Sequence, residues 1–244
     1  MRREAHGTFG RGAKAEMSVL IYTRNHTPDG KGFVHDNIAS SVAALKELCA
    51  QAGLEAEASD DPAVFTEAGL KPREAVVFAN SNNEAFATDA QRGALLDYVY
   101  NGGAFMGVHS ATGSERKSEA FRQMLGARFA WHPPLQPFTL LVNDRRHPAT
   151  AHLGATWEWA DEAYVCDCVP DIHVLLDLDV ATLVKAPRDK RLESFANGRY
   201  PLAWCRRHGE GRVFYTALGH KKEHYQDAAF RTHLSKGLLW AMGR

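Results

Sequence analysis

The residue with the clearest chemical potential is His109, which stands where an apolar run gives way to small residues. Residues 104–108 read as a buried strand, and Ser110 and Gly113 lie in the turn that follows. Open α/β sheets bind ligands at the carboxyl ends of their strands, so a polar side chain at this turn is a candidate site residue. An imidazole takes or gives a proton near neutral pH and also binds metals. An ordinary turn histidine, bonded only to nearby backbone, is the alternative.

Other histidines also fall at or near the ends of predicted elements. The chain has 12 histidines, and His132 and His220 join His109 as candidate catalytic residues. Two prolines follow His132 and would hold its ring in place, although the ring could equally pack on Trp131. His220 follows a predicted strand. His35 precedes a predicted helix, where it either faces a ligand or caps the helix.

Two adjacent acids, Asp161 and Glu162, lie among Trp157, Trp159 and Tyr164. Carbohydrate sites commonly combine aromatic platforms with carboxylates. Adjacent side chains of a strand face opposite sides, so only one of the two acids would enter a site. We expect Glu162 to be the catalytic acid, because Asp161 could serve as a cap. A solvated turn beside two core aromatics is the alternative.

Further side chains at the same predicted edge are candidates for substrate contacts. Ser110 could act as a nucleophile beside a histidine, but a hydroxyl in a tight turn more commonly bonds local backbone. Asn80 opens a polar loop after a predicted strand. The predicted substrate-binding set is His35, Asn80, Ser110, Tyr164 and Tyr225.

Metal binding is the main rival to acid–base chemistry at these residues. Histidines with one carboxylate would suit zinc or another divalent ion. No H-x-x-x-H or H-E-x-x-H spacing supports such a site, so the ligands would have to come from separate loops. The sequence therefore establishes no cofactor and leaves a divalent metal open; the ligands would be His35, His109, His132 and His220.

The order of predicted elements indicates an α/β fold. Strands and helices alternate through the first half of the chain, which is typical of a parallel sheet covered by helices. Asp36 or Asn37 is expected to cap the first helix and Thr88 a later one. The second half predicts further strands, a hairpin and a closing helix. The predicted strands are residues 18–23, 54–59, 75–79, 104–108, 138–142, 173–178, 200–206 and 212–216, and the main helices begin near residues 38, 88, 119 and 227.

Composition excludes several classes of protein. The 244 residues carry 29 basic and 29 acidic side chains, so the net charge gives no argument for nucleic acid or a membrane surface as partner. No run of about 18 apolar residues predicts a transmembrane helix. We expect residues 1–16 to be a disordered extension, with Met17 an alternative start, and residues 17–244 to form one domain. Free cysteines suit a reducing cytoplasm, and the length permits a homodimer.

Three segments together resemble one family. They are GGAFMGVHS (residues 102–110), WHPP with DRRHP (131–134 and 144–148), and PLAWCRRHGEGRVFYTALGH (201–220). The chain resembles the ThuA-like, trehalose-utilisation family. The resemblance implies a flavodoxin-like fold, similar to class I glutamine amidotransferases, with added strands in the C-terminal half. It puts His109 where an amidotransferase carries its cysteine nucleophile, so glutaminase chemistry is not expected.

The resemblance also implies carbohydrate metabolism, in pathways of trehalose and related disaccharides that pass through 3-keto sugars. We expect acid–base chemistry on a small keto-sugar, giving isomerisation or glycosidic cleavage. His109 would be the general base or acid, assisted by His132, His220 and Glu162. A metal-dependent hydrolase using the same histidines is one alternative. A non-catalytic sugar-binding or interaction protein on an amidotransferase-like scaffold is the other.

Overall fold

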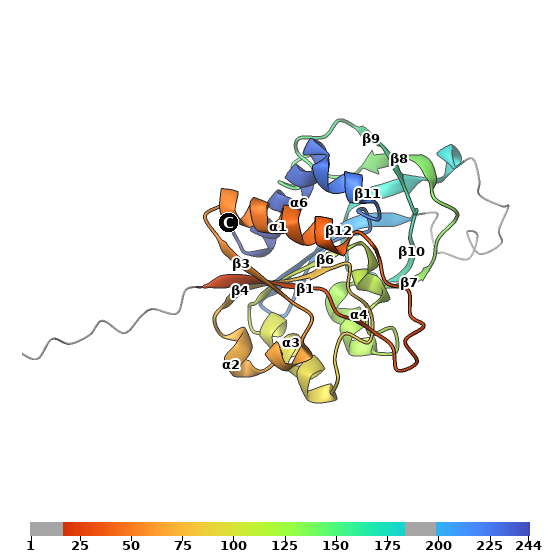
Figure 1. Cartoon of the computed structure of the whole chain (residues 1–244). Coiled ribbons are helices and arrows are strands. Elements are labelled where there is room, and N and C mark those ends of the chain that lie inside the picture. Colours follow the sequence, from red (N-terminus) through yellow and green to blue (C-terminus); the bar gives the residue numbers. More distant parts are fainter. Residues whose placement is uncertain (1–16, 184–198) are drawn as a thin grey trace, which may run out of the picture.

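A computed structural model describes residues 17–183 and 199–244 of the chain (Figure 1). The predicted disordered extension, residues 1–16, lies outside the described residues.

One mixed sheet of nine strands runs through the described part of the molecule. Its parallel half has the order β3-β1-β4-β6-β13, and its other half continues as β12-β11-β8-β9 in antiparallel pairs. The parallel order is the one found in flavodoxin-like sheets, which bind ligands at the carboxyl edge. The strands are β1 (Ser18–Tyr22), β3 (Glu55–Ser59), β4 (Arg73–Ala79), β6 (Ala104–Val108), β8 (Gln136–Val142), β9 (Thr156–Asp161), β11 (His173–Asp179), β12 (Pro201–His208) and β13 (Gly211–Thr216).

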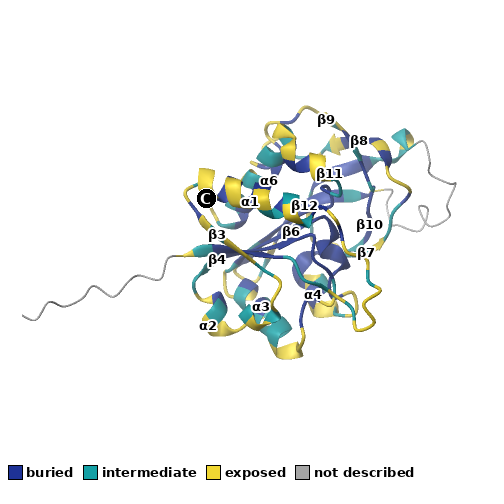
Figure 2. Cartoon of the chain, in the orientation of Figure 1, coloured by how far each residue is buried: buried dark blue, intermediate teal, exposed yellow. Residues whose placement is uncertain are grey.

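Helices cover both faces of the parallel half (Figure 1). One face carries α1 (Ile38–Gln51) and α6 (Ala228–Ala241), and the other carries α2 (Glu67–Leu70), α3 (Asp89–Tyr100) and α4 (Glu119–Leu125). Because both faces are covered, the central strands are apolar and buried along their length (Figure 2). Short pairs lie beside the sheet: β7 (Ala127–Trp131) with β10 (Val165–Cys168), and β2 (Asn25–His26) with β5 (Asn82–Asn83).

The structure confirms the predicted α/β class and the added antiparallel strands. Thr88 caps α3 as predicted, and Gln91 completes a capping box. The predicted side-chain cap of α1 is wrong. Asn37 stands at the N-cap but makes no capping bond; its amide instead donates to the backbone oxygens of Gly219 at 2.6 Å and His220 at 2.7 Å. A long-range partner has replaced the local one.

Candidate functional site

A strained turn presents His109 at the carboxyl end of β6. The 3-10 turn η2 (His109–Gly113) follows the strand directly, and His109 has a φ of +50°. The Tyr215 hydroxyl donates to the His109 carbonyl oxygen at 2.6 Å. His109 Nδ1 lies 2.7 Å from the Ala217 carbonyl oxygen, so this nitrogen carries the proton that it donates. The other ring nitrogen, Nε2, is thereby left with its lone pair free for other groups.

Two further imidazoles and a phenol converge on His109 Nε2. It lies 3.1 Å from His35 Nε2, 3.3 Å from His220 Nδ1 and 3.0 Å from the Tyr164 hydroxyl. Glu162 Oε2 lies 3.7 Å from the same nitrogen and 3.3 Å from His220 Nδ1. We call His35, His109, His220 and Glu162 the histidine cluster.

The histidine cluster has the composition of a metal site. One potential ligand atom from each of its members lies within 4.8 Å of the others. The members come from separate parts of the chain: the segment before α1, the end of β6, the end of β9 and the turn after β13. The edge of the sheet brings them together in space. The sequence could not show this convergence, because the residues form no local metal-binding motif.

His132 closes the cluster on its solvent side. Its Nδ1 donates to the Pro133 carbonyl oxygen at 2.9 Å, and its Nε2 lies 3.6 Å from Glu162 Oε1. The side chain of His132 is 35% exposed, that of His220 23% and that of Glu162 15%, whereas His109 is fully buried. A small molecule arriving from solvent therefore meets His132, His220 and Glu162 before it meets His109.

Burial determines the charge of the inner groups. Together with neighbouring imidazoles, it lowers the pKa of His35 and of His109 to about 3. Burial also raises the pKa of the Glu162 carboxyl, although the nearby His132 and His220 act against this rise. Both inner imidazoles are consequently neutral at pH 7, with lone pairs available.

Asp161 supports the site in a way that the sequence did not predict. The residue is fully buried at the end of β9. Its carboxylate accepts from Gly219 N at 2.9 Å, from Trp159 Nε1 at 3.1 Å and from Glu162 N at 2.8 Å. Asp161 thus connects the turn that carries His220 to Glu162, the candidate catalytic carboxylate. Alternate side chains of β9 face the same side of the sheet, so Asp161 lies on the same face as the buried Trp159. This alternation could have indicated that Asp161 is buried.

Asn80 and Tyr225 lie behind the turn that carries His220. Both are buried; Asn80 Nδ2 donates to the Tyr225 hydroxyl at 2.8 Å, and that hydroxyl donates to the Gly219 carbonyl oxygen at 3.0 Å. Their contacts support Gly219 and His220. Substrate contact by either residue stays a prediction.

Ser110 is also buried, and its hydroxyl has no hydrogen-bond partner among the described residues. The local backbone bond expected for it is therefore not formed. Tyr164 is buried as well; its hydroxyl lies 3.0 Å from His109 Nε2, and its ring stacks 5.8 Å from that of His132. Substrate contact by Tyr164 stays a prediction.

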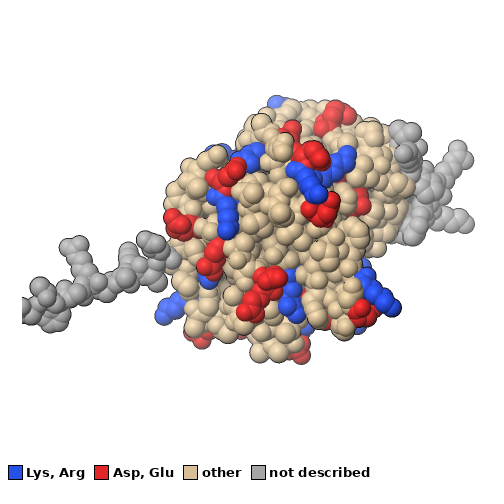
Figure 3. All heavy atoms as spheres, viewed as in Figure 1, with Lys and Arg blue, Asp and Glu red and all other residues tan. Residues whose placement is uncertain are grey.

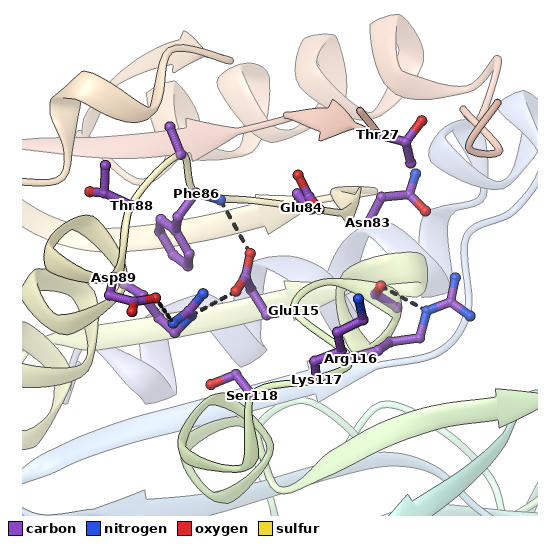
Figure 4. A pocket seen from close by; sticks show the side chains of 13 residues that line it. Thr27, Asn83, Glu84, Phe86, Thr88, Asp89, Glu115, Arg116, Lys117 and Ser118 are labelled. Atoms are coloured by element: carbon purple, nitrogen blue, oxygen red, sulfur yellow. Dashed lines mark hydrogen bonds and ion pairs between the residues drawn. The ribbon is translucent and has the colours of Figure 1, made fainter. Parts of the chain in front are cut away.

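A separate open cavity of about 710 Å³ lies beside η2 and the start of α3 (Figure 4). Its buried acid, Glu115, already accepts from Ala85 N at 2.9 Å and from Arg92 Nε at 2.7 Å. The carboxylate is thus occupied in holding the loop before α3. The remaining polar lining includes Thr27, Asn83, Glu84 and Lys117.

Comparisons with known proteins agree with this architecture. The sequence pattern of the ThuA family, described as trehalose utilisation, matches residues 18–241. The chain belongs to the ThuA family. A comparison with curated proteins gave no match.

Solved structures of ThuA-like proteins share the fold. One from Bacteroides uniformis ATCC 8492 is 23% identical, with a TM-score of 0.70 over 96% of this chain and 95% of that one. One from Parabacteroides merdae ATCC 43184 is 20% identical, with a TM-score of 0.70 over 93% and 90%. The Cytoplasmic Protein STM3548 from Salmonella typhimurium is 11% identical, with a TM-score of 0.60 over 92% and 99%.

The ThuA fold here carries no helix long and apolar enough to cross a membrane within residues 17–183 and 199–244.

Proposed function

We propose that this ThuA-family protein is an enzyme of sugar utilisation that transfers a proton on a keto-sugar at the histidine cluster. The family description supplies the sugar. The observation that carries the proposal is the convergence of imidazole nitrogens and one carboxylate on a solvent-reachable edge of the sheet. Titratable groups gathered in this way are typical of acid–base sites.

Proton removal beside a ketone is the reaction that such a group can perform. The carbonyl acidifies the neighbouring C–H bond, so a base takes that proton while the C–H electron pair moves to form an enolate. Protonation of the enolate oxygen gives an enediol. The hydroxyl on the deprotonated carbon then loses its proton while a proton adds to the former carbonyl carbon, which gives the isomeric keto-sugar. A glycosyl oxygen can also stand on the carbon that follows the deprotonated carbon, away from the carbonyl. The enolate then expels it: that C–O bond breaks, and the leaving oxygen takes up a proton.

The solvent-facing residues suit the proton transfer best. Among the imidazoles of this site His132 is the most exposed, and an imidazole can serve as both general base and general acid. The bond from Nδ1 to the Pro133 carbonyl oxygen orients that ring, and Glu162 Oε1 lies 3.6 Å from its Nε2. The Tyr164 hydroxyl can donate a hydrogen bond to the oxygen on which charge develops. His109 is fully buried, and its Nε2 positions and polarises the surrounding side chains of His35, His220 and Tyr164.

The test is proton NMR of 3-keto-trehalose or a 3-keto-glucoside in D₂O with the purified protein. We expect deuterium to enter the position beside the carbonyl, or the glycosidic bond to break. His109→Asn should remove this activity, and asparagine is chosen because it tolerates a positive φ. If the wild-type protein binds the sugar and leaves it chemically unchanged, the protein is a sugar-binding module instead.

We place this chemistry in the cytoplasm. The four cysteines, Cys49, Cys166, Cys168 and Cys205, are all free thiols, as a reducing compartment favours. A structural neighbour from Salmonella typhimurium bears the name Cytoplasmic Protein.

A further inference from the structure

We propose that the histidine cluster binds one divalent transition-metal ion of the zinc class, through His35 Nε2, His109 Nε2, His220 Nδ1 and Glu162 Oε2. The inference deepens the proposed function because it concerns the same cluster. Its evidence is independent of any reaction, and its test measures metal rather than turnover.

All six separations between the four atoms are within 4.8 Å, and four of them are close to those of ligands around one ion. Metal–nitrogen bonds of zinc sites put neighbouring ligands of a tetrahedron about 3.4 Å apart. The observed separations are 3.1 Å for His35 to His109, 3.3 Å for His109 to His220, and 3.3 Å for His220 to Glu162. Glu162 and His109 are 3.7 Å apart. One small cation at the centre would reach all four atoms.

Protons alone do not satisfy this arrangement. His109 donates through Nδ1 to the Ala217 carbonyl oxygen, so its neutral ring has a single lone pair at Nε2. Two imidazole nitrogens and the Tyr164 hydroxyl crowd that one lone pair at 3.0–3.3 Å. An sp² nitrogen accepts one such bond well. A cation would instead take a lone pair from each ring.

The ligand types select the class of metal. Imidazole nitrogen suits zinc, iron, copper and nickel, whereas magnesium and calcium prefer oxygen ligands. Three nitrogens and one carboxylate therefore favour a first-row transition metal. Outer contacts of the kind that orient metal ligands are also present: the Ala217 carbonyl fixes the tautomer of His109, and His132 lies beside the free oxygen of Glu162.

A metal here would contribute both structure and chemistry. His35 comes from the segment between β2 and α1, while the other ligands follow β6, β9 and β13. One ion would therefore fasten this segment to the sheet edge and raise the melting temperature. It would also supply a Lewis acid for the carbonyl oxygen of a keto-sugar.

The experiment uses the full chain, stripped with a strong chelator and then titrated with Zn²⁺ and Mn²⁺. Bound metal is measured by mass spectrometry and stability by thermal unfolding. We expect one ion per chain and a higher melting temperature with metal. His35→Ala and Glu162→Gln should each weaken binding at least about 100-fold. The exposed His26→Ala and Glu84→Gln are matched controls that should bind like the wild type.

The inference is overturned if the stripped wild-type protein takes up no stoichiometric metal. It is also overturned if His35→Ala and Glu162→Gln bind as the controls do, because the ions would then lie elsewhere. Deuterium exchange by a protein that takes up no metal in the titration would overturn this inference and leave the proposed function standing. Bound metal without exchange on any keto-sugar would do the reverse.

Discussion

The backbone of His109 is the most informative single feature at the residue scale. A non-glycine residue with a φ of +50° sits in the left-handed region, which costs roughly 1 kcal/mol or more. The strain is offset by the Tyr215 hydroxyl on the His109 carbonyl and by the bond from Nδ1 to Ala217. Because a glycine would remove the strain, a histidine at this position suggests that the imidazole itself is used.

Asp161 gives the residue-scale prediction. Asp161→Asn replaces one acceptor oxygen with an NH₂ group, which turns an N–H toward either Glu162 N or the donors of Gly219 and Trp159. Burial makes such a mismatch costly, so we expect the free energy of unfolding to fall by about 1–3 kcal/mol. Urea unfolding measures it. The exposed Asp97→Asn should change stability little, and an equal loss in both variants would contradict the role given to Asp161.

At the scale of elements, the sequence pattern predicted the strands and helices whose positions depend on neighbouring residues in the chain. The bounds of β6 follow from an apolar run, and α4 begins at the predicted residue; the structure adds that Ser118 caps this helix. The fold class followed from the alternation of such elements. Contacts between distant segments could not be predicted. Asn37 bonds to Gly219 across 182 positions rather than capping α1, and Asp161 bonds to the same glycine.

The candidate site divides in the same way. Residue type and strand ends pointed to His109, His132, His220 and Glu162, and the structure brings these four side chains together. The roles of the polar residues packed behind them could not be predicted, because the sequence does not show which polar residue faces the site and which supports a turn. Asn80 and Tyr225 show this, since the Tyr225 hydroxyl bonds to the Gly219 carbonyl oxygen and Asn80 bonds to that hydroxyl.

The turn after β13 gives the element-scale prediction. Gly219 has a φ of +113°, and a Cβ there would lie 2.9 Å from the Tyr225 hydroxyl. Gly219→Ala should therefore lower the melting temperature and displace His220, with a loss of about 1–3 kcal/mol from strain and contact together. Gly30→Ala is the matched control, because Gly30 has a φ of +67° with nothing within 4 Å. Equal losses in the two variants would mean that the contact with Tyr225 is unimportant.

At the scale of the whole molecule, charge is balanced rather than concentrated. On the face in Figure 3, acidic and basic side chains are interspersed, and their totals of 29 and 29 are equal. Two histidines in the interior, His147 and His233, contribute to the packing of the fold. His147 packs on Trp240, with ring centroids 5.1 Å apart, and His233 lies 5.2 Å from Phe214. These rings join α6 to the sheet and to the segment after β8.

Acid should destabilise the fold through these two histidines, in addition to the buried His35 and His109 of the histidine cluster. Burial lowers the pKa of His147 and of His233 to about 4, against about 6.5 in an unfolded chain. Above pH 6.5 both states are neutral; below it the unfolded chain binds protons that the folded one rejects, so stability falls as the pH falls toward 4. Between pH 7 and 5 we expect a loss of about 2 kcal/mol per histidine.

Urea unfolding at several pH values measures this loss. His233→Gln should flatten the dependence on pH, although it also lowers stability at pH 7 because it removes a ring from the core. The exposed His26→Gln should leave the dependence unchanged. A wild-type stability that stays constant from pH 7 to 5 would show that the buried rings take up protons in the folded state.

The most direct test of the account is the rate of deuterium exchange beside the carbonyl of a 3-keto-glucoside, compared between Glu162→Gln and Glu84→Gln. Glu162 belongs to the histidine cluster, whereas Glu84 lines the separate cavity of Figure 4. The account predicts that Glu162→Gln exchanges at least about 100-fold more slowly than the wild type, while Glu84→Gln exchanges normally. Normal exchange by Glu162→Gln together with loss in Glu84→Gln would place the reaction in the other cavity and contradict the central claim.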